Sequence, residues 1–135
     1  MYMLDSCVCI DFMRGRLPHL YDLLRASDPA MFKIPAIVEA ELRLGAEKSA
    51  NPAKNRLLLE RFLEPFEVVP FGSRCALAYA RTRADLEARG MLIGPNDLLI
   101  ASTALAHQAV LVTENVREFK RVPGLAVEFW DELEL

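Results

Sequence analysis

Apolar positions follow two patterns that alternate along this chain. Short, nearly continuous apolar runs are typical of buried parallel strands, and longer segments with apolar residues every three or four positions are typical of helices. The short runs predict strands at 1–5, 31–34, 66–69, 110–112 and 125–129. The longer segments predict helices at 6–15, 17–26, 36–45, 51–64, 73–89, 97–107 and 115–120.

Strands that alternate with helices predict an α/β fold in three layers, with a mainly parallel central sheet of about five strands flanked by helices. The 135 residues contain no linker, internal repeat or low-complexity tract, so we expect a single domain over 1–135. Ser6 is the expected N-cap of the first helix. Gly15 and Gly90 are expected just beyond helix ends.

Composition places the chain among soluble globular proteins, since 53% of residues are hydrophobic and 26% are charged. No apolar run approaches the roughly 18 residues of a membrane span, and the amino terminus does not resemble a signal peptide. We therefore expect a cytoplasmic protein with no membrane partner. The three cysteines are an odd number without zinc-ligand spacing, so a disulfide framework is not expected.

The net charge of −3 argues against a nucleic-acid binder, unless the acidic residues gather in one metal-neutralised pocket. The basic residues are grouped, either to contact phosphate or as solvated surface: Arg14 and Arg16; Lys48, Lys54 and Arg56; Arg117, Lys120 and Arg121.

Four acidic residues do not fit a purely structural interpretation. Asp5 ends the first strand, and in open α/β sheets ligands bind beyond the carboxyl ends of the strands. At 100° per residue, Glu41 lies in the middle of the apolar face of its helix, where a carboxylate is costly unless it is paired or metal-bound. Glu39 falls on the outer face and can pair with Arg43. The structural alternative for Glu41 is a buried salt bridge to an arginine.

Asp97 opens a helix that is apolar nearly all round and therefore buried. Its alternative role is helix-end electrostatics. Glu118 is the fourth acid, with a helix cap as its alternative, because Asn115 and Glu118 have capping-box spacing. Glu114 is surface or a further site acid, and Thr113 offers a hydroxyl at a strand end.

Converging carboxylates would repel one another and raise their own pKa values, so the set predicts a cation. Mg²⁺ takes oxygen ligands, and it can activate water and stabilise the charge that develops in phosphodiester hydrolysis. The sequence has no glycine-rich phosphate loop, zinc-protease motif or nucleophile elbow. Cys7 stands where haloacid-dehalogenase-like phosphatases have a second Asp, and the acidic pair and lysine of receiver domains are not evident.

At four places, in order, the chain resembles PIN-domain ribonucleases and specifically VapC-type toxins of bacterial type II toxin–antitoxin pairs. The matching segments are Met3-Leu-Asp5-Ser, Glu41-Leu-Arg-Leu-Gly-Ala-Glu-Lys-Ser49, Ile93-Gly-Pro-Asn-Asp97-Leu-Leu-Ile-Ala101, and Leu111-Val-Thr-Glu-Asn-Val-Arg-Glu118-Phe with Val122-Pro-Gly-Leu125. By position, Asp5, Glu41 and Asp97 correspond to the family's metal-binding catalytic acids, and Glu118 to a further catalytic acid.

This resemblance implies a PIN fold, dependence on Mg²⁺ or Mn²⁺, and endonucleolytic cleavage of structured cellular RNA such as tRNA. It also implies a homodimer, a higher-order assembly with a cognate VapB-like antitoxin, and inhibition by an antitoxin segment that presents a basic residue to the acids. The first motif departs from the family's usual Asp-Thr-Asn, because Ser6 keeps the hydroxyl but Cys7 replaces the amide. The late motif reads Thr113-Glu-Asn115 instead of Thr-Asn-Asn or Thr-Asn-Asp. The competing function is a PIN-like module that binds a protein or RNA and cuts nothing.

Overall fold

The sheet at the centre of the molecule has five strands, all parallel. In this computed structural model, which describes residues 1–17, 22 and 24–130, their order is β3-β2-β1-β4-β5. The strands are β1 (Tyr2–Leu4), β2 (Phe32–Pro35), β3 (Glu67–Val69), β4 (Val110–Val112) and β5 (Ala126–Glu128). The predicted α/β fold with a five-stranded parallel sheet is confirmed. Because β1 is central and the chain continues to β2 on one side and β4 on the other, the topology reverses at β1.

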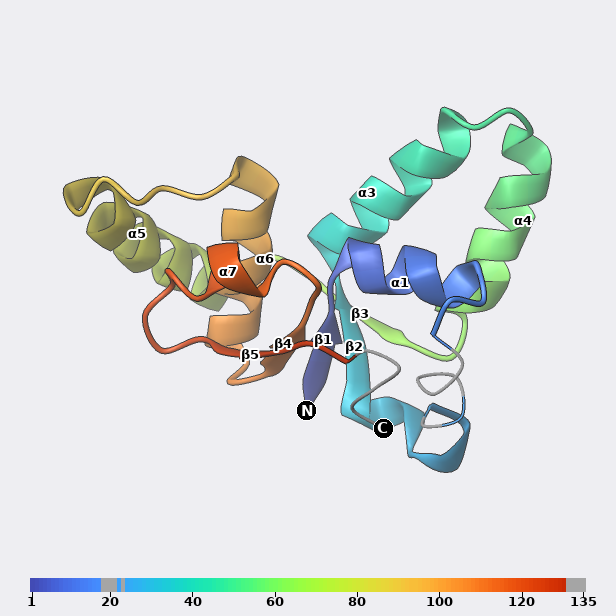
Figure 1. Ribbon diagram of the computed structural model, residues 1–135, viewed down its shortest axis with the longest axis horizontal. Helices are drawn as coiled ribbons and strands as arrows, with labels where there is room; N and C mark the ends of the chain where they lie inside the picture. Colours follow the sequence, from blue (N-terminus) through green and yellow to red (C-terminus); the bar gives the residue numbers. More distant parts are fainter. Residues whose placement is uncertain (18–21, 23, 131–135) are drawn as a thin grey trace.

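Helices flank this sheet (Figure 1). They are α1 (Ser6–Met13), α3 (Ala36–Glu47), α4 (Pro52–Leu63), α5 (Ser73–Ala88), α6 (Pro95–Ala106), α7 (Val116–Phe119) and the short 3₁₀ helix η1 (Pro29–Met31). In Figure 1, α5 and α6 lie beside the β4–β5 end of the sheet, and α1, α3 and α4 lie together at the β2–β3 end. The helix predicted over 17–26 lies partly outside the described residues.

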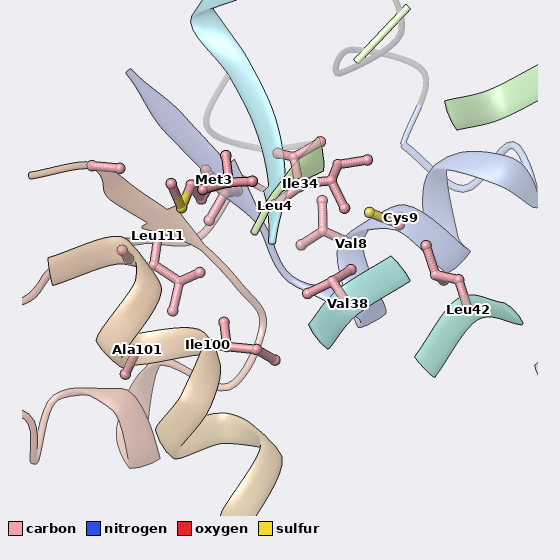
Figure 2. Packing of buried hydrophobic residues seen from close by; sticks show 14 of the residues in the cluster. Met3, Leu4, Val8, Cys9, Ile34, Val38, Leu42, Ile100, Ala101 and Leu111 are labelled. Carbon is pink, nitrogen blue, oxygen red and sulfur yellow. The ribbon is translucent and has the colours of Figure 1, made fainter. Parts of the chain in front are cut away.

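The core forms where the apolar strands meet the apolar faces of the helices. Met3, Ile34 and Leu111, one from each of the three central strands, are fully buried. Figure 2 shows Val38 and Leu42 of α3 on the side that faces α1. This packing holds α1 and α3 against the sheet, and both helices begin at its carboxyl edge.

The N-cap of α1 and the start of α6 differ from those predicted. The N-cap of α1 is Asp5 rather than Ser6, since Asp5 has extended backbone and its Oδ1 accepts a hydrogen bond of 2.8 Å from Ser6 N. Helix α6 begins at Pro95, two residues before the predicted start, because proline suits a first helical position whose N–H would have no partner. Gly15 and Gly90 adopt positive φ beyond α1 and α5, at 71° and 64°.

Cys7, Cys9 and Cys75 are all free thiols, which agrees with the sequence prediction. Among the described residues, none of the helices has both the length and the apolar character needed to cross a membrane.

Candidate active site

The four acidic side chains singled out in the sequence come from four elements at the carboxyl edge of the sheet. Asp5 follows β1, Glu41 lies in the second turn of α3, Asp97 in the first turn of α6, and Glu118 on α7 after β4. They are close enough to interact, because the negative charges of Glu118, Asp5 and Glu41 all raise the pKa of Asp97. The structure therefore brings together side chains that are up to 113 positions apart (118 − 5) in the chain.

Asp5 is the most firmly held of the four acids, and only 5% of it is exposed. Its Oδ1 caps α1 through Ser6 N, and its Oδ2 accepts a 2.7 Å hydrogen bond from the Thr113 hydroxyl. The Cys7 thiol approaches the same Oδ2 at 3.6 Å. Thr113 is itself fully buried and accepts from Asn115 N at 3.0 Å. Thr113 thus orients Asp5. The sequence showed only that Thr113 offers a hydroxyl at a strand end, and it did not indicate this role.

Cys7 occupies the position where the family usually has an amide. Burial, followed by the charge of Asp5, raises the pKa of its thiol to about 11. The thiol is therefore protonated at neutral pH and can donate a weak hydrogen bond to Asp5. This replacement keeps a donor beside Asp5, although a weaker one than an amide.

Glu41 carries an unusual feature, since its Oε1 is buried and has no hydrogen-bond partner. Burial, and then the charge of Asp5, raises the pKa of this carboxyl, while the side chains of Asn96 and Ser6 act in the opposite direction. No arginine among the described residues forms an ion pair with Glu41, so the buried salt bridge considered from the sequence is not found there. Buried polar atoms without a partner are rare, and a bound ion is one of the features that explains them.

Glu39, two residues away, behaves as the helical wheel predicted. Its carboxylate forms an ion pair of 2.9 Å with Arg43, one turn later on α3. Neighbouring glutamates of the same helix therefore differ in environment: one is neutralised near the surface, and the other faces Asp5.

Asp97 and Glu118 form a hydrogen-bonded pair of acids whose pKa values are shifted in opposite directions. Burial is the first cause that raises the pKa of Asp97, to about 7, followed by the charge of Glu118, with which it hydrogen-bonds. The pKa of Glu118 is lowered instead, chiefly because its Oε1 accepts from Gly94 N at 2.8 Å. Asp97 is thus the protonated partner and Glu118 the carboxylate.

Glu118 is not part of a capping box. In a capping box its side chain would accept from the backbone of Asn115, but Asn115 N donates to Thr113 and the Asn115 amide donates to Glu118. Glu114 points elsewhere: a hydrogen bond with Asp11, and then burial, raises its pKa to about 7. Of the residues left open in the late motif, Glu118 is therefore the one beside Asp97.

Asn96 was not singled out from the sequence. Its side chain lowers the pKa of Glu41 from the first turn of α6, one residue before Asp97. An amide directly before a candidate acid at a helix start was the available signal, but the sequence does not show that α3 and α6 meet here.

The donor set is chemically suited to a hard cation, because all four side chains offer carboxylate oxygens. In the described residues, no three His, Cys, Asp or Glu side chains are arranged to hold a metal ion as they stand. The partnerless Glu41 Oε1 and the raised pKa of Asp97 are both features that a bound cation would relieve.

Comparison with known proteins decides the family. Residues 2–125 match the family model described as PIN domain. The chain belongs to the PIN-domain family. Within this family it is 40% identical to Ribonuclease VapC2 of Rickettsia felis over 132 residues, which cover 97% of this chain and 98% of the relative. It is 35% identical to the tRNA(fMet)-specific endonuclease VapC of Salmonella typhimurium, with 96% of this PIN domain chain and 97% of the relative covered.

Solved structures agree with these relatives. The crystal structure of VapBC2 from Rickettsia felis, bound to a DNA fragment from its promoter, contains a chain that superposes with a TM-score of 0.90 at 39% identity. The match covers 96% of this PIN domain chain and 98% of that chain. The resemblance to VapC-type PIN domains inferred from the four sequence motifs is confirmed.

Proposed function

We propose that this protein is a metal-dependent endoribonuclease that acts as the toxin of a toxin–antitoxin pair. The observation that carries the proposal is the convergence of Asp5, Glu41, Asp97 and Glu118 at the carboxyl edge of the sheet, with one buried Glu41 oxygen left without a partner. Relatives that are named ribonucleases and endonucleases across nearly the whole chain support the same activity.

Asp5, Glu41 and Asp97 are the residues that we propose to hold Mg²⁺ or Mn²⁺. A divalent cation bound there would supply an activated water and would stabilise the negative charge that develops at the scissile phosphate. Hydrogen bonds from Ser6 N and the Thr113 hydroxyl fix both oxygens of Asp5. Glu41 and Asp97 would complete the set of ligands, Asp97 after losing its proton.

Glu118 has a separate role in this proposal. The Gly94 N–H and the Asn115 amide hold its carboxylate ionised beside Asp97. An ionised carboxylate in this position can accept a proton from water during hydrolysis, and the proton that Asp97 gives up goes to solvent. Glu118 is therefore proposed as the general base of the site rather than as one of the three metal ligands.

The antitoxin is proposed by analogy with the similar structures. These are VapBC complexes, from Rickettsia felis and from Salmonella typhimurium, and both contain DNA. We propose that this chain binds a VapB-like antitoxin that presents a basic residue to the four acids, and that it forms a homodimer in the cytoplasm. Measuring the mass of the purified chain with and without its antitoxin tests the assembly.

Cleavage of total cellular RNA by the purified, antitoxin-free protein tests the activity. We expect discrete fragments with Mg²⁺, none with EDTA, and none from Asp97→Asn under Mg²⁺, because that variant keeps the shape of Asp97 but loses the charge. Initiator tRNA is the first defined substrate to try, since one relative is named for it. Glu39→Gln is the control for Glu41→Gln: it should cut at the wild-type rate, because Glu39 is paired with Arg43 away from the acids.

The outcomes separate the enzyme from the non-catalytic binding module. A folded protein that binds a divalent cation and RNA but cuts neither total RNA nor tRNA is the binding module. Cleavage that persists in EDTA but disappears in Asp97→Asn would contradict the metal mechanism. Cleavage by every variant would reveal a contaminating nuclease.

A further inference from the structure

A groove that leads away from the acids has no role in the mechanism described so far. It lies between α1, α3 and α4, with a volume of about 410 Å³. Figure 1 shows these three helices close together, with α3 and α4 rising above α1. We call it the α1/α3/α4 groove, and its walls include Met13, Glu41, Ser49, Asn55 and Leu58.

The groove and the acid site share one side chain. Glu41 lines the groove, and its carboxylate also interacts with Asp5. A ligand in the groove would therefore be directly beside the proposed metal site. The substrate of the proposed function is RNA. In an RNA chain the group closest to the scissile phosphate is the neighbouring nucleotide.

The walls combine the two kinds of surface that single-stranded RNA needs. Met13 and Leu58 are large apolar residues that are 39% and 46% exposed, so they offer apolar surface to a ligand. Asn55 lines the groove with a side-chain amide that has no partner among the described residues, and Ser49 adds a hydroxyl that donates to Ala46 O but can still accept. Proteins bind unstacked bases by apolar contact on the base face and by hydrogen bonds to the base edge.

One cation lines the groove, and two more are sequence neighbours of lining residues. Arg14 lines it, Lys48 precedes the lining residue Ser49, and Lys54 precedes the lining residue Asn55. In the described part of the chain these three cations have no ion-pair partner. The other two basic residues of the same sequence clusters are neutralised: Arg16 by Asp11 and Arg56 by Glu47. Among the described residues of a protein with net charge −3, Arg14 is thus a cation on the groove wall that no ion pair neutralises, and it would attract a phosphate.

We propose that the α1/α3/α4 groove is a nucleotide subsite that holds the RNA nucleotide adjacent to the scissile phosphate. The base lies against Met13 and Leu58 with its edge toward Asn55 and Ser49, and Arg14 contacts the phosphate. This inference rests on the proposed function and deepens it, because it assigns part of the RNA-binding surface. Arg14 on the wall, with Lys48 and Lys54 next to lining residues in the sequence, favours a polyanion, and a protein segment is the alternative occupant to be tested.

Gly45 provides a way to block the groove without disturbing the fold. It lies on the groove wall within α3, and a Cβ added there would meet no atom within 4 Å. Gly45→Leu should therefore fill the groove while the helix gains propensity, since glycine is a poor helix former. Gly45→Ala adds only a methyl group and is the graded comparison. Arg14→Gln tests the charge independently, and Arg81→Gln is its matched control, because Arg81 is exposed on α5 and does not line the groove.

The experiment measures binding and cleavage separately. Binding of a fluorescent single-stranded RNA oligonucleotide is followed by anisotropy with each variant placed in the Asp97→Asn background, and cleavage is measured with Asp97 intact. We expect Gly45→Leu to weaken RNA binding about tenfold or more, as loss of a stacked base would. Gly45→Ala should weaken RNA binding less than Gly45→Leu. Arg14→Gln should weaken RNA binding severalfold and make the affinity depend less steeply on salt, and Arg81→Gln should leave RNA binding unchanged. In cleavage assays KM should rise while Mn²⁺ binding, measured by calorimetry, stays the same.

Each contrary outcome has a distinct meaning. If wild-type protein cuts RNA and both Gly45→Leu and Arg14→Gln bind and cut like it, the groove is not an RNA subsite. If these variants keep RNA binding but lose binding of the antitoxin, the groove is a protein site and the proposal is overturned. If the wild-type protein neither binds nor cuts RNA, the proposed function fails first, and the subsite fails with it.

Discussion

Individual acidic side chains in the site lower the stability of the folded protein when they are ionised. Asp97 has a pKa of about 7 in the folded, metal-free protein, far above its ordinary value of 3.8. An acid whose pKa is higher in the folded state contributes stability that is fully present below its unfolded pKa. That stability is lost as pH rises through the folded pKa. The site therefore costs stability near neutral pH when no cation is bound.

Asp97→Asn should accordingly stabilise the metal-free protein. At pH 8 in EDTA we expect a gain of about 1 kcal/mol in the free energy of unfolding, after discounting for solvent screening. At pH 4 the gain should be much smaller, because Asp97 is then protonated in the folded protein and partly protonated in the unfolded chain, where its pKa is 3.8. Urea denaturation at both pH values measures the difference. Equal effects at the two pH values would contradict this account, and Asp85→Asn, which removes only a surface pair with Arg89, should not stabilise at either pH.

A second prediction at this scale concerns substitutions of Cys7. Its thiol is a weak donor to Asp5 Oδ2, so Cys7→Ala should lower kcat/KM by about two- to fivefold, the effect of losing one modest hydrogen bond. Cys7→Asn restores the family's usual amide and should keep activity at or above the wild-type level. RNA cleavage with the three proteins under Mg²⁺ measures this. A loss in Cys7→Ala as large as that in Asp5→Asn would mean that the sulfur has a direct role.

At the scale of secondary structure, the sequence predicted the elements well because each has a strong local signal. The strand at 110–112 and the helix beginning at Pro52 lie where apolar pattern and proline placed them. The inward position of Glu41 followed from helical geometry alone. The N-cap of α1 was misplaced by one residue, because Asp5 and Ser6 are both good caps and only the backbone shows which is extended.

Contacts between elements could not be predicted in the same way. The hydrogen bond from Gly94 N to Glu118 joins the start of α6 to α7 across 24 positions, and it is what distinguishes Glu118 from Glu114. Glu114 instead meets Asp11, which lies 103 positions earlier (114 − 11) in the chain. Periodicity predicts which face of a helix is buried, but it does not show which residue of another helix lies against that face.

At the scale of the whole molecule, the acid cluster links folding stability to metal and to pH. Burial and negative charge raise the pKa of Asp97 to about 7, and the hydrogen bond with Asp11 raises that of the largely exposed Glu114 to about 7. Both groups favour the folded state while protonated, so the metal-free protein should lose stability as pH rises from 6 to 8. A cation that binds the ionised acids of the folded protein stabilises it by mass action.

The increase in Tm caused by Mn²⁺ should therefore be larger at pH 8 than at pH 6, because protons compete with the metal for Asp97 at the lower pH. Thermal melting in EDTA and in Mn²⁺ at both pH values measures this directly. Glu41→Gln should lose most of the Mn²⁺ effect, and Glu39→Gln should keep it, since Glu39 is held by Arg43 outside the cluster. An increase in Tm that is equal at the two pH values, or equal in the two variants, would show that Mn²⁺ binds somewhere other than these acids.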